Sequence, residues 1–453
     1  MENNRLFEQL LLWMAVVGAI ALARFRRKDN GVGLILAYVL NLWLIHWLAV
    51  SLYLLPDFRN YDPQIVALGF EQSLYAIFAF AFGSVVLTPF ILNLGLLSHG
   101  TITHTLDRRL PKAYIAIGAF SFLALSLGVG WLPSATAIVS TGQQLVVAGL
   151  GLCCWQARKE RNYKMLQFWL AMTLLLPFIT IVTRGFIGYG AVAALSVLVF
   201  TSTFVRSRSL LLVGGILLGY LGISVYVTYM RDRGEIREVV WGGQSFQDRV
   251  DRIATTVKNF EWFDPSNNDH LKRVDGRLNQ SYLAGLAVSR LSDVGGYGHG
   301  ATLWEALLAL IPRALWPDKP VSAGSGNLAS DYTGVQFAQG TSVGIGQVME
   351  FYVNFGTLGV VIGFVIMGLL VTTLDKMAAA SLAHNDLHSF ILWYLPGLSL
   401  LQVGGSLVEV TSSAVASIIV AYAANRYLDR MQRKQIASVR ARLAPQSLAQ
   451  VHE

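Results

Sequence analysis

Charged residues are scarce in this chain. They make up 14% of its 453 residues, whereas 54% of the residues are hydrophobic. A soluble domain carries about a quarter charged residues, so the composition excludes an ordinary soluble enzyme. The hydrophobic residues also come in blocks of about twenty, the length of a helix that crosses a bilayer. Because backbone groups in lipid must be paired within their own segment, these blocks indicate membrane helices.

Cysteine is nearly absent as well. The two cysteines are adjacent, Cys153 and Cys154, and neighbours of this kind rarely form a sound structural disulfide. The chain contains no Walker A motif. Its polar segment 230–342 contains no Asp-x-Asp pair of the kind that holds a metal in nucleotide-sugar transferases. We therefore expect no cofactor and no metal, and an already activated substrate for any reaction.

The sequence predicts an all-α, polytopic integral membrane protein with about eleven transmembrane helices and one large extracytoplasmic loop. The predicted spans are 6–23, 31–55, 65–97, 113–131, 135–157, 165–183, 186–205, 209–229, 343–374, 389–405 and 407–424. The chain then divides into the first eight helices (1–229), the large loop with short helices (230–342), the last three helices (343–424) and a basic tail (425–453).

Positive charge distinguishes the two sides of the membrane. The formal net charge is +8, and Lys and Arg gather in alternate short connections, such as 24–28 and 158–164, and in the tail. The positive-inside rule places these connections and the C-terminus in the cytoplasm. Segment 230–342 then lies outside. We expect a multi-pass protein of the cell inner membrane, with this segment in the periplasm. This distribution argues against nucleic acid as a partner.

Within 230–342 three pieces have structural signals. Residues 248–258 and 276–291 have helical patterns. Residues 301–311 are apolar but too short to cross a bilayer. With Trp304 and Trp316 near its ends, this third piece is expected to lie at the membrane interface. Loops of this length are usually functional in compact proteins.

Polar residues within or beside the spans point to a site on the outer side. Charges at membrane depth are costly and need a reason. The residues concerned are Glu71, Arg184, Glu350 and Glu409. A hydrogen bond between helices explains any one of them equally well, but their grouping favours a site. Glu350 also shares one helix face with Gly346 and Asn354, which suits the binding of sugar hydroxyls or a proton.

Cationic residues on the same side could bind phosphate. Arg184 stands among glycines that allow a sharp turn, and its guanidinium group can hold phosphate bidentately. The alternative is an interfacial arginine that touches lipid headgroups. Arg313 and Lys319 lie among prolines, which stiffen the chain, and Arg290 precedes a glycine-rich run that carries His299. His299 is either a base or an ordinary loop histidine.

Three motifs resemble the bacterial oligosaccharide repeat unit polymerases, the O-antigen polymerase or Wzy-type family. They are Thr183-Arg184-Gly185, then Ile311-Pro312-Arg313 through Trp316-Pro317-Asp318-Lys319-Pro320, then Gly344-Ile345-Gly346 with Glu350-Phe351-Tyr352-Val353-Asn354-Phe355-Gly356. Their order matches the family's pattern, as does the large outer loop between late spans. The arrangement of helices and loops resembles that of the family over most of the chain, whereas the matching motifs cover only a small part of it.

The resemblance implies polymerisation of undecaprenyl-diphosphate-linked oligosaccharide repeat units at the periplasmic face, for O-antigen, capsule or exopolysaccharide. Lipid diphosphate leaves, so neither nucleotide nor metal is required. Cations would stabilise the leaving oxygen, and a base would take the proton of the attacking hydroxyl. For the diphosphate we expect Arg184, Arg290, Arg313 and Lys319. For the base we expect Glu350, with His299 second, and for sugar binding Tyr352 and Asn354.

Other functions stay open. A ligase of the O-antigen type would transfer a finished glycan once. A transporter or flippase of lipid-linked oligosaccharide also needs outward cations, although the chain lacks the repeated halves that transporters usually have. A scaffold would leave the grouped polar residues unexplained. The expected partners are the lipid-linked oligosaccharide and membrane lipid, with a chain-length regulator and a flippase as candidate protein partners.

Overall fold

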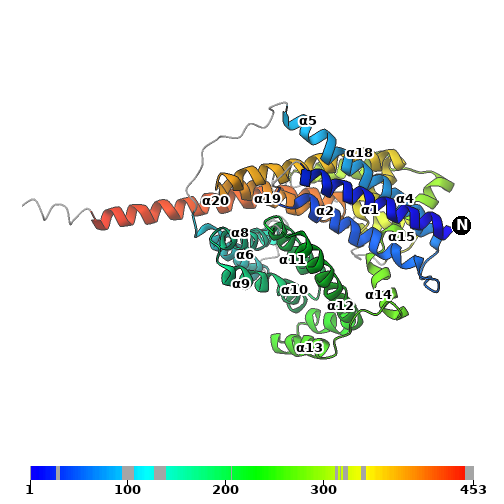
Figure 1. Cartoon of the computed structure of the whole chain (residues 1–453), viewed down its shortest axis with the longest axis horizontal. Coiled ribbons are helices and arrows are strands. Elements are labelled where there is room, and N and C mark those ends of the chain that lie inside the picture. The colour runs from blue at the N-terminus through cyan, green and yellow to red at the C-terminus, as the bar shows by residue number, and fades with distance from the viewer. Residues whose placement is uncertain are drawn as a thin grey trace, which may run out of the picture.

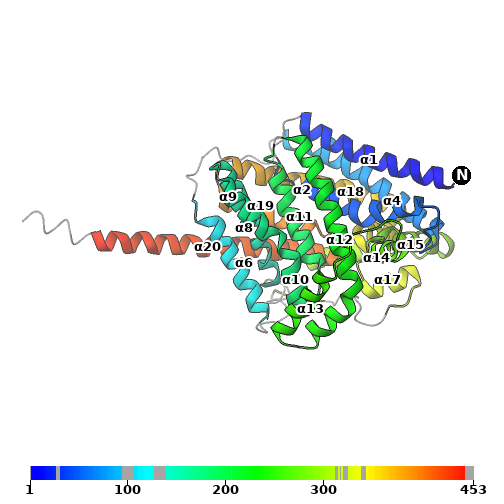
Figure 2. The same cartoon turned by 60° about the horizontal axis from the view of Figure 1, so that its bottom comes forward.

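The computed structural model describes residues 2–26, 31–93, 107–126, 139–205, 207–311, 315–316, 318–319, 325–337 and 343–443. Every regular element within these ranges is a helix. The helices form an elongated bundle in which α1 (Glu2–Arg26), α4 (Pro63–Ala81) and α18 (Gly346–Ala383) lie side by side (Figures 1 and 2). The end of α20 (Leu407–Leu443) projects alone beyond the bundle.

The other helices complete the bundle in chain order. Before α12 they are α2 (Leu34–Leu42), η1 (Trp43–Trp47), α3 (Leu48–Ser51), η2 (Leu52–Leu54), η3 (Phe82–Leu87), α5 (Thr88–Asn93), α6 (Leu110–Ser126), α8 (Gln144–Lys159), α9 (Tyr163–Leu174), α10 (Leu176–Arg184) and α11 (Gly188–Ser202). From there on they are α12 (Arg208–Trp241), α13 (Phe246–Lys258), α14 (Asn268–Leu278), α15 (Gln280–Val294), α16 (Ala301–Ala309), α17 (Ser325–Thr333) and α19 (Leu387–Leu400).

The chain is an α-helical membrane protein. Seven helical stretches are long and apolar enough to cross a membrane: Asn4–Arg24, Leu34–Leu54, Pro63–Ile91, Tyr163–Arg184, Ser209–Trp241, Gly346–Ala383 and Leu407–Gln435. Each of them coincides with a predicted span. Three further predicted spans fall on shorter apolar helices, Leu110–Ala124, Gly188–Ser202 and Leu387–Leu400. The predicted span 135–157 overlaps α8, which begins at Gln144.

Three of the predicted spans end well inside continuous helices, among them 343–374, since α18 continues to Ala383. The eighth span was expected to end at 229, but α12 continues to Trp241 and has 34 residues. At 1.5 Å per residue α12 is about 51 Å long, well beyond the roughly 30 Å of a hydrocarbon core. Likewise α20 runs without a break through position 424. The charged ends of α12 and α20 therefore extend the membrane helices instead of forming separate loops.

The segment 230–342 packs against the bundle through α15. Gly285 of α15 crosses Gly69 of α4 so closely that a Cβ on Gly285 would lie 1.8 Å from the Ile65 carbonyl oxygen. Only glycine permits this approach of two backbones. The α15 helix therefore belongs to the bundle and contacts both α4 and α18.

Of the two helices predicted within 230–342, one is confirmed and the other is divided into two helices. The helix expected over 248–258 is confirmed as α13, which begins with a capping box between Ser245 and Asp248. The single helix expected over 276–291 is wrong, because the chain breaks at Asn279. The Asn279 side chain accepts a hydrogen bond from the Tyr282 amide (3.1 Å) and so starts α15 as a new helix. Asparagine is among the best residues at this capping position.

A kink divides α18 into two arms. Phe355 and Gly356 have non-helical backbone angles, and Gly356 has φ 62° and ψ −152°, a combination that glycine alone adopts readily. The short arm 346–354 is almost wholly buried, and it carries the polar residues that the sequence singled out. The kink therefore separates this arm from the long apolar arm that follows it.

Candidate functional site

The short arm of α18 holds a buried carboxylate. Glu350 is fully buried (0% exposed). Its Oε2 atom accepts a hydrogen bond from the backbone amide of Leu407 (2.6 Å), at the start of α20. Its Oε1 atom has no hydrogen-bond partner among the described residues. The Thr302 hydroxyl of α16 lies close enough to influence the carboxylate. Glu350 thus sits between the ends of two helices with one oxygen atom unpaired.

Asn354, one turn further along α18, binds the chain that directly follows His299. Its Oδ1 atom accepts from the Gly300 amide (3.0 Å). Its amide group donates to the Thr302 hydroxyl and to the Glu350 carbonyl oxygen, both at 2.7 Å. Asn354 is fully buried (0% exposed), and its two donor hydrogens are both used by these bonds. We therefore assign it the task of holding the loop, whereas the sequence suggested sugar binding.

His299 lies exposed on the loop that Asn354 holds. Its backbone has φ 45°, and Gly300 beside it has φ 93°. The amide of Gly298 donates to the Val353 carbonyl oxygen of α18 (2.8 Å). The structure thus brings the loop of His299 against the short arm of α18 that carries Glu350 and Asn354, more than fifty residues further along the sequence. Glu350 and Asn354 lie on the same face of α18, as their four-residue spacing in the sequence predicts.

Two other predicted residues lie near this loop. Tyr352 is buried, and its ring centroid is 6.1 Å from that of Tyr297. Arg290 is exposed at the end of α15, where a Cβ on Gly334 would lie 3.0 Å from its Nη1 atom. Arg290 therefore lies against the turn after α17.

Lys319 caps a helix. Its ammonium group donates to the carbonyl oxygens of Leu308 (3.2 Å) and Ile311 (3.0 Å), at the C-terminal end of α16. A cation at this end of a helix is favourable, because the last carbonyl groups lack partners within the helix. Arg313, the fourth residue expected at the diphosphate, lies outside the described residues.

Arg184 lies in another part of the bundle, at the end of α10. Its guanidinium group packs over the rings of Phe122 (5.7 Å) and Tyr189 (5.6 Å). The backbone of this turn is bound by α12: Trp241 donates to the Arg184 carbonyl oxygen (3.1 Å), and Tyr229 donates to that of Gly185 (2.8 Å). Gly185 has φ 71°, the left-handed conformation that favours glycine at a helix end.

One face of α12 beside this turn carries arginines that the sequence analysis missed. Tyr229, Arg233, Arg237 and Trp241 are spaced by four, so they lie on one face. The guanidinium group of Arg237 lies 4.3 Å from the ring centroid of Phe186 and 4.9 Å from that of Trp241. The four-residue spacing was visible in the sequence. A span that ends at 229 assigns these residues to a loop, where a four-residue spacing predicts no shared face.

Arg277 of α14 joins these residues. The positive charges of Arg233, Arg237 and Arg277 lie close enough to repel one another. We call these three residues the arginine cluster. None of the three forms an ion pair with a carboxylate in the part of the chain that the structure describes. The Nε atom of Arg237 is buried without a hydrogen-bond partner there. Unneutralised guanidinium groups in this arrangement favour an anionic ligand.

Asp275 fixes the helix that carries Arg277. It is 1% exposed and accepts hydrogen bonds from Asn60 (2.8 Å), Asn279 (2.7 Å) and Tyr53 (3.1 Å). Burial raises the pKa of Asp275, and the hydrogen bonds from these neighbours offset part of the rise. The carboxylate thus ties α14 to the connection between α3 and α4.

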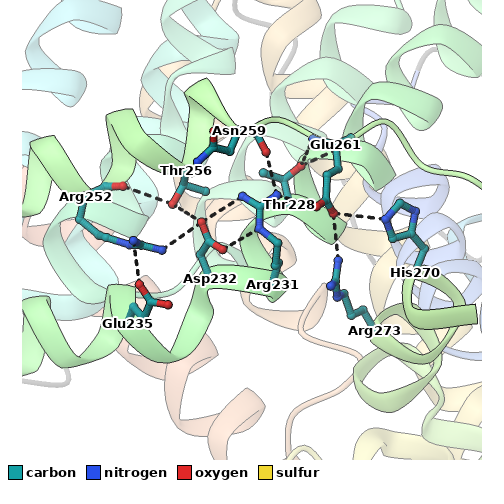
Figure 3. Close-up of polar contacts among 10 residues, drawn as sticks. All are labelled: Thr228, Arg231, Asp232, Glu235, Arg252, Thr256, Asn259, Glu261, His270 and Arg273. Atoms are coloured by element: carbon teal, nitrogen blue, oxygen red, sulfur yellow. Dashed lines mark hydrogen bonds and ion pairs between the residues drawn. The ribbon is translucent and has the colours of Figure 1, made fainter. Parts of the chain in front are cut away.

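A neighbouring set of charges is fully paired. Arg231 donates to Asp232 (2.7 Å) and to Glu261 (2.7 Å), and Glu261 also accepts from Arg273 (3.1 Å) (Figure 3). His270 lies 3.2 Å from Glu261. Burial alone would raise the pKa of Glu261, but Arg231, Arg273 and His270 outweigh it and hold the pKa below its usual value. Arg252 of α13 pairs with Asp232 (3.1 Å) and Glu235 (2.7 Å) of α12, so the ion pairs of this set fix both α13 and α14 on α12.

A short link connects the arginine cluster with the buried carboxylate. Gln280 follows Arg277 by three residues, so their Cα atoms are at most about 11 Å apart. The Gln280 side chain donates to the carbonyl oxygens of Gly344 (3.2 Å) and Gly404 (3.3 Å). Gly344 lies two residues before the short arm of α18 that carries Glu350. The cluster and the carboxylate therefore belong to one end of the bundle.

The other two outer-side carboxylates that the sequence singled out have partners of their own. Glu71 pairs with Arg5 (3.2 Å) and accepts from Tyr75 (3.0 Å). Glu409 accepts from the Ser406 amide (3.3 Å) and so caps its own helix. Among the described residues no three His, Cys, Asp or Glu side chains lie together in a way that could hold a metal ion.

Comparison with models of protein families finds no match for this chain, and neither curated proteins nor solved structures give one.

Proposed function

We propose that this chain is a membrane glycosyltransferase that polymerises undecaprenyl-diphosphate-linked oligosaccharide repeat units. The arginine cluster carries the proposal. Three guanidinium groups without carboxylate partners among the described residues lie near one another, and that of Arg237 packs over aromatic rings. A short link separates them from a buried carboxylate with one unpaired oxygen. A lipid-linked sugar diphosphate needs this combination: cations for the diphosphate and an acid–base group for the sugar.

The proposed reaction is glycosyl transfer with lipid diphosphate as the leaving group. A hydroxyl oxygen on the new repeat unit attacks the anomeric carbon of the growing glycan, and the bond from that carbon to the diphosphate oxygen breaks. The electron pair stays on the diphosphate, where negative charge grows in an oxocarbenium-like transition state. Arg233, Arg237 and Arg277 would stabilise this charge, with Arg184 beside them. Arg290 and Arg313 remain proposed contacts, whereas Lys319 is occupied by the end of α16.

The proton of the attacking hydroxyl needs an acceptor. Glu350 is the first candidate, but it is fully buried, so α16 must shift before the carboxylate can meet a hydroxyl. His299 is exposed on the adjoining loop and needs no such shift. Tyr352 is proposed to orient the sugar. Glu350→Gln and His299→Ala variants at equal protein levels decide between the two: the base is the residue whose loss abolishes chain growth.

The proposal includes an orientation of the chain in the membrane. We place about eleven helices in the cell inner membrane, with the shorter apolar helices also crossing. Segment 230–342 lies in the periplasm, and the projecting basic end of α20 lies in the cytoplasm, in keeping with the positive-inside rule.

The glycan made by a deletion strain tests the proposal. Without the gene, a polymerase deficiency leaves single lipid-linked repeat units at the outer face in place of a ladder of chain lengths, and the restored gene returns the ladder. Full-length polymer that is never attached would identify a ligase instead. Repeat units held on the inner leaflet would identify a flippase. Either of the last two results contradicts the proposal.

A further inference from the structure

The part of α20 that leaves the bundle has two different faces. On one face Ala421, Asn425 and Leu428 are buried. The Asn425 side chain fixes this face, because it donates to the His388 carbonyl oxygen (2.9 Å) and accepts from the Tyr114 hydroxyl (2.7 Å). Beyond these contacts α20 projects from the bundle (Figures 1 and 2). The bundle therefore sets the direction in which the other face of α20 points.

The other face is exposed, and its character changes along the helix. It begins with Ile419 (38% exposed) and Tyr422 (57% exposed). It continues with Arg426, Arg430 and Arg433, which are all exposed. Successive members of this series are three or four residues apart, so they share one face. The order from apolar through aromatic to cationic side chains is typical of a membrane helix where it leaves the bilayer.

Distances along the helix axis agree with this order. Tyrosine at the end of a membrane helix is typical of the interface between membrane and water. Arg426 lies about 6 Å beyond Tyr422, and Arg430 lies about 12 Å beyond it. The polar layer beside the hydrocarbon core is about 5–8 Å thick. Side chains lean towards the N-terminus of their helix, which here is the membrane side, so both long arginine side chains can reach the lipid phosphate groups.

The protein does not neutralise the cations of this face. Four exposed cations form no ion pair with a carboxylate in the part of the chain that the structure describes. We call them the basic face, and they are Arg426, Arg430, Arg433 and Lys434. The one acidic residue between them, Asp429, lies 3.4 Å from the Nδ1 atom of His388. Arg426 donates to the Tyr422 hydroxyl (3.1 Å), a neutral group that orients the guanidinium group and leaves its charge unpaired.

We propose that the basic face binds anionic phospholipid, with Arg426 and Arg430 on headgroup phosphates and Arg433 and Lys434 adding attraction at longer range. A planar guanidinium group can hold two phosphate oxygens at once. Lys434 lies about 6 Å along the axis from Arg430, within a Debye length of about 8 Å, so its charge still acts at the headgroups. Lipid is the partner, because the same face carries the apolar and aromatic residues of the membrane part of α20. This inference depends neither on the proposed enzymatic activity nor on which side of the membrane this end lies.

Contact quenching at the site tests the proposal. In a variant with Cys153→Ala and Cys154→Ala, a fluorophore is attached to Ala423→Cys, an exposed position three residues before Arg426. The full-length protein is placed in phosphatidylcholine nanodiscs with a trace of spin-labelled phosphatidylglycerol or of spin-labelled phosphatidylcholine. A spin label quenches only a fluorophore beside it, so the ratio of the two quenching efficiencies gives the local lipid preference. We expect a preference of roughly fivefold or more for phosphatidylglycerol.

Charge variants and a second label position provide the controls. The preference should fall towards one when Arg426→Gln and Arg430→Gln are combined. It should largely survive when both arginines are replaced by lysine, which keeps the charge. The same fluorophore at Phe7→Cys, an exposed position beside the Arg5–Glu71 ion pair (3.2 Å), should show a much weaker preference, because the charges of that pair cancel.

Equal quenching by the two lipids at position 423 would overturn the proposal. A preference that survives the loss of both arginines would overturn it as well. Inorganic phosphate distinguishes lipid from a free anion, with chloride at the same ionic strength as the reference. Phosphate should leave the lipid preference unchanged. Loss of the preference with phosphate alone means that the basic face binds free phosphate, and the proposal is then wrong.

Discussion

At the scale of single residues, the pairing state of an arginine distinguishes a binding role from a structural one. Arg231 and Arg237 lie on the same helix, six residues apart. Arg231 forms ion pairs with Asp232 and Glu261, whereas Arg237 has aromatic neighbours and no carboxylate partner among the described residues. The two residues therefore form a matched pair for mutation.

Arg237→Gln is expected to shorten the glycan chains and leave the protein stable. Hydrogen bonds to charged groups contribute about 1.5–3 kcal/mol, so the rate should fall roughly 10- to 100-fold. Arg231→Gln should do the reverse, with a lower Tm in detergent because Asp232 and Glu261 each lose one of their ion-pair partners. Glycan ladders and thermal unfolding curves measure the two effects. A normal ladder with Arg237→Gln at normal protein level would count against the arginine cluster.

The pairing of Glu261 predicts a pH dependence of stability. Its pKa in the folded protein is below the usual value of about 4.3. A carboxylate with a lowered folded-state pKa stabilises the protein above its unfolded-state pKa and loses this contribution as the pH falls through the folded value. The Tm advantage of the wild type over Glu261→Gln should therefore be full at pH 6 to 7 and shrink below about pH 4. An unchanged advantage down to pH 3 would contradict the pairing.

At the scale of the elements, the crossing of α4 and α15 brings segment 230–342 into the bundle. The two helices touch through glycines, and Gly285 has no room for a side chain. Gly276 on α14 offers a control, since a Cβ there would meet nothing within 4 Å. The two glycines lie nine positions apart and differ in their surroundings.

Gly285→Ala should lower the Tm and the yield, because overpacking of a close contact costs about 1–3 kcal/mol or more. Gly276→Ala should leave the Tm unchanged or raise it, since alanine favours a helix by about 1 kcal/mol over glycine. Thermal unfolding of both variants in the same detergent makes the comparison. Equal Tm values for the two would show that α15 does not pack on α4 in this way.

The sequence predicted these elements unevenly, for physical reasons. The long spans could be predicted, because lipid demands about twenty apolar residues whatever the fold. The break at Asn279 was missed, because the apolar pattern continues through it and only the capping side chain ends the helix. The four-residue spacing of Gly346, Glu350 and Asn354 did predict their shared face.

Burial and clustering could not be predicted, because they depend on contacts between distant segments. Glu350 is covered by α16 and α20, which pack beside the short arm of α18. The arginine cluster forms only when α14 packs on α12, and this contact leaves no local pattern in the sequence. Lys319 was expected at a phosphate, but the free carbonyl groups at the end of α16 hold it.

At the scale of the whole molecule, the proposal places the charged end of α12 and the projecting end of α20 on opposite sides of the membrane. Gln247 and Arg430 are exposed positions near these two ends. In a cysteine-free background, a membrane-impermeant thiol reagent should label Gln247→Cys in intact spheroplasts. It should reach Arg430→Cys only after permeabilisation. Labelling in the opposite order would reverse the proposed orientation.

The most direct measurement follows chain growth by the purified protein alone. The full-length chain in nanodiscs is incubated with lipid-linked repeat units extracted from the deletion strain, and the products are separated by size. The account predicts a ladder of multiples of the unit, with one lipid diphosphate released for each new glycosidic bond and a much weaker ladder for Arg237→Gln. Repeat units that stay single, with no lipid diphosphate released, would contradict it.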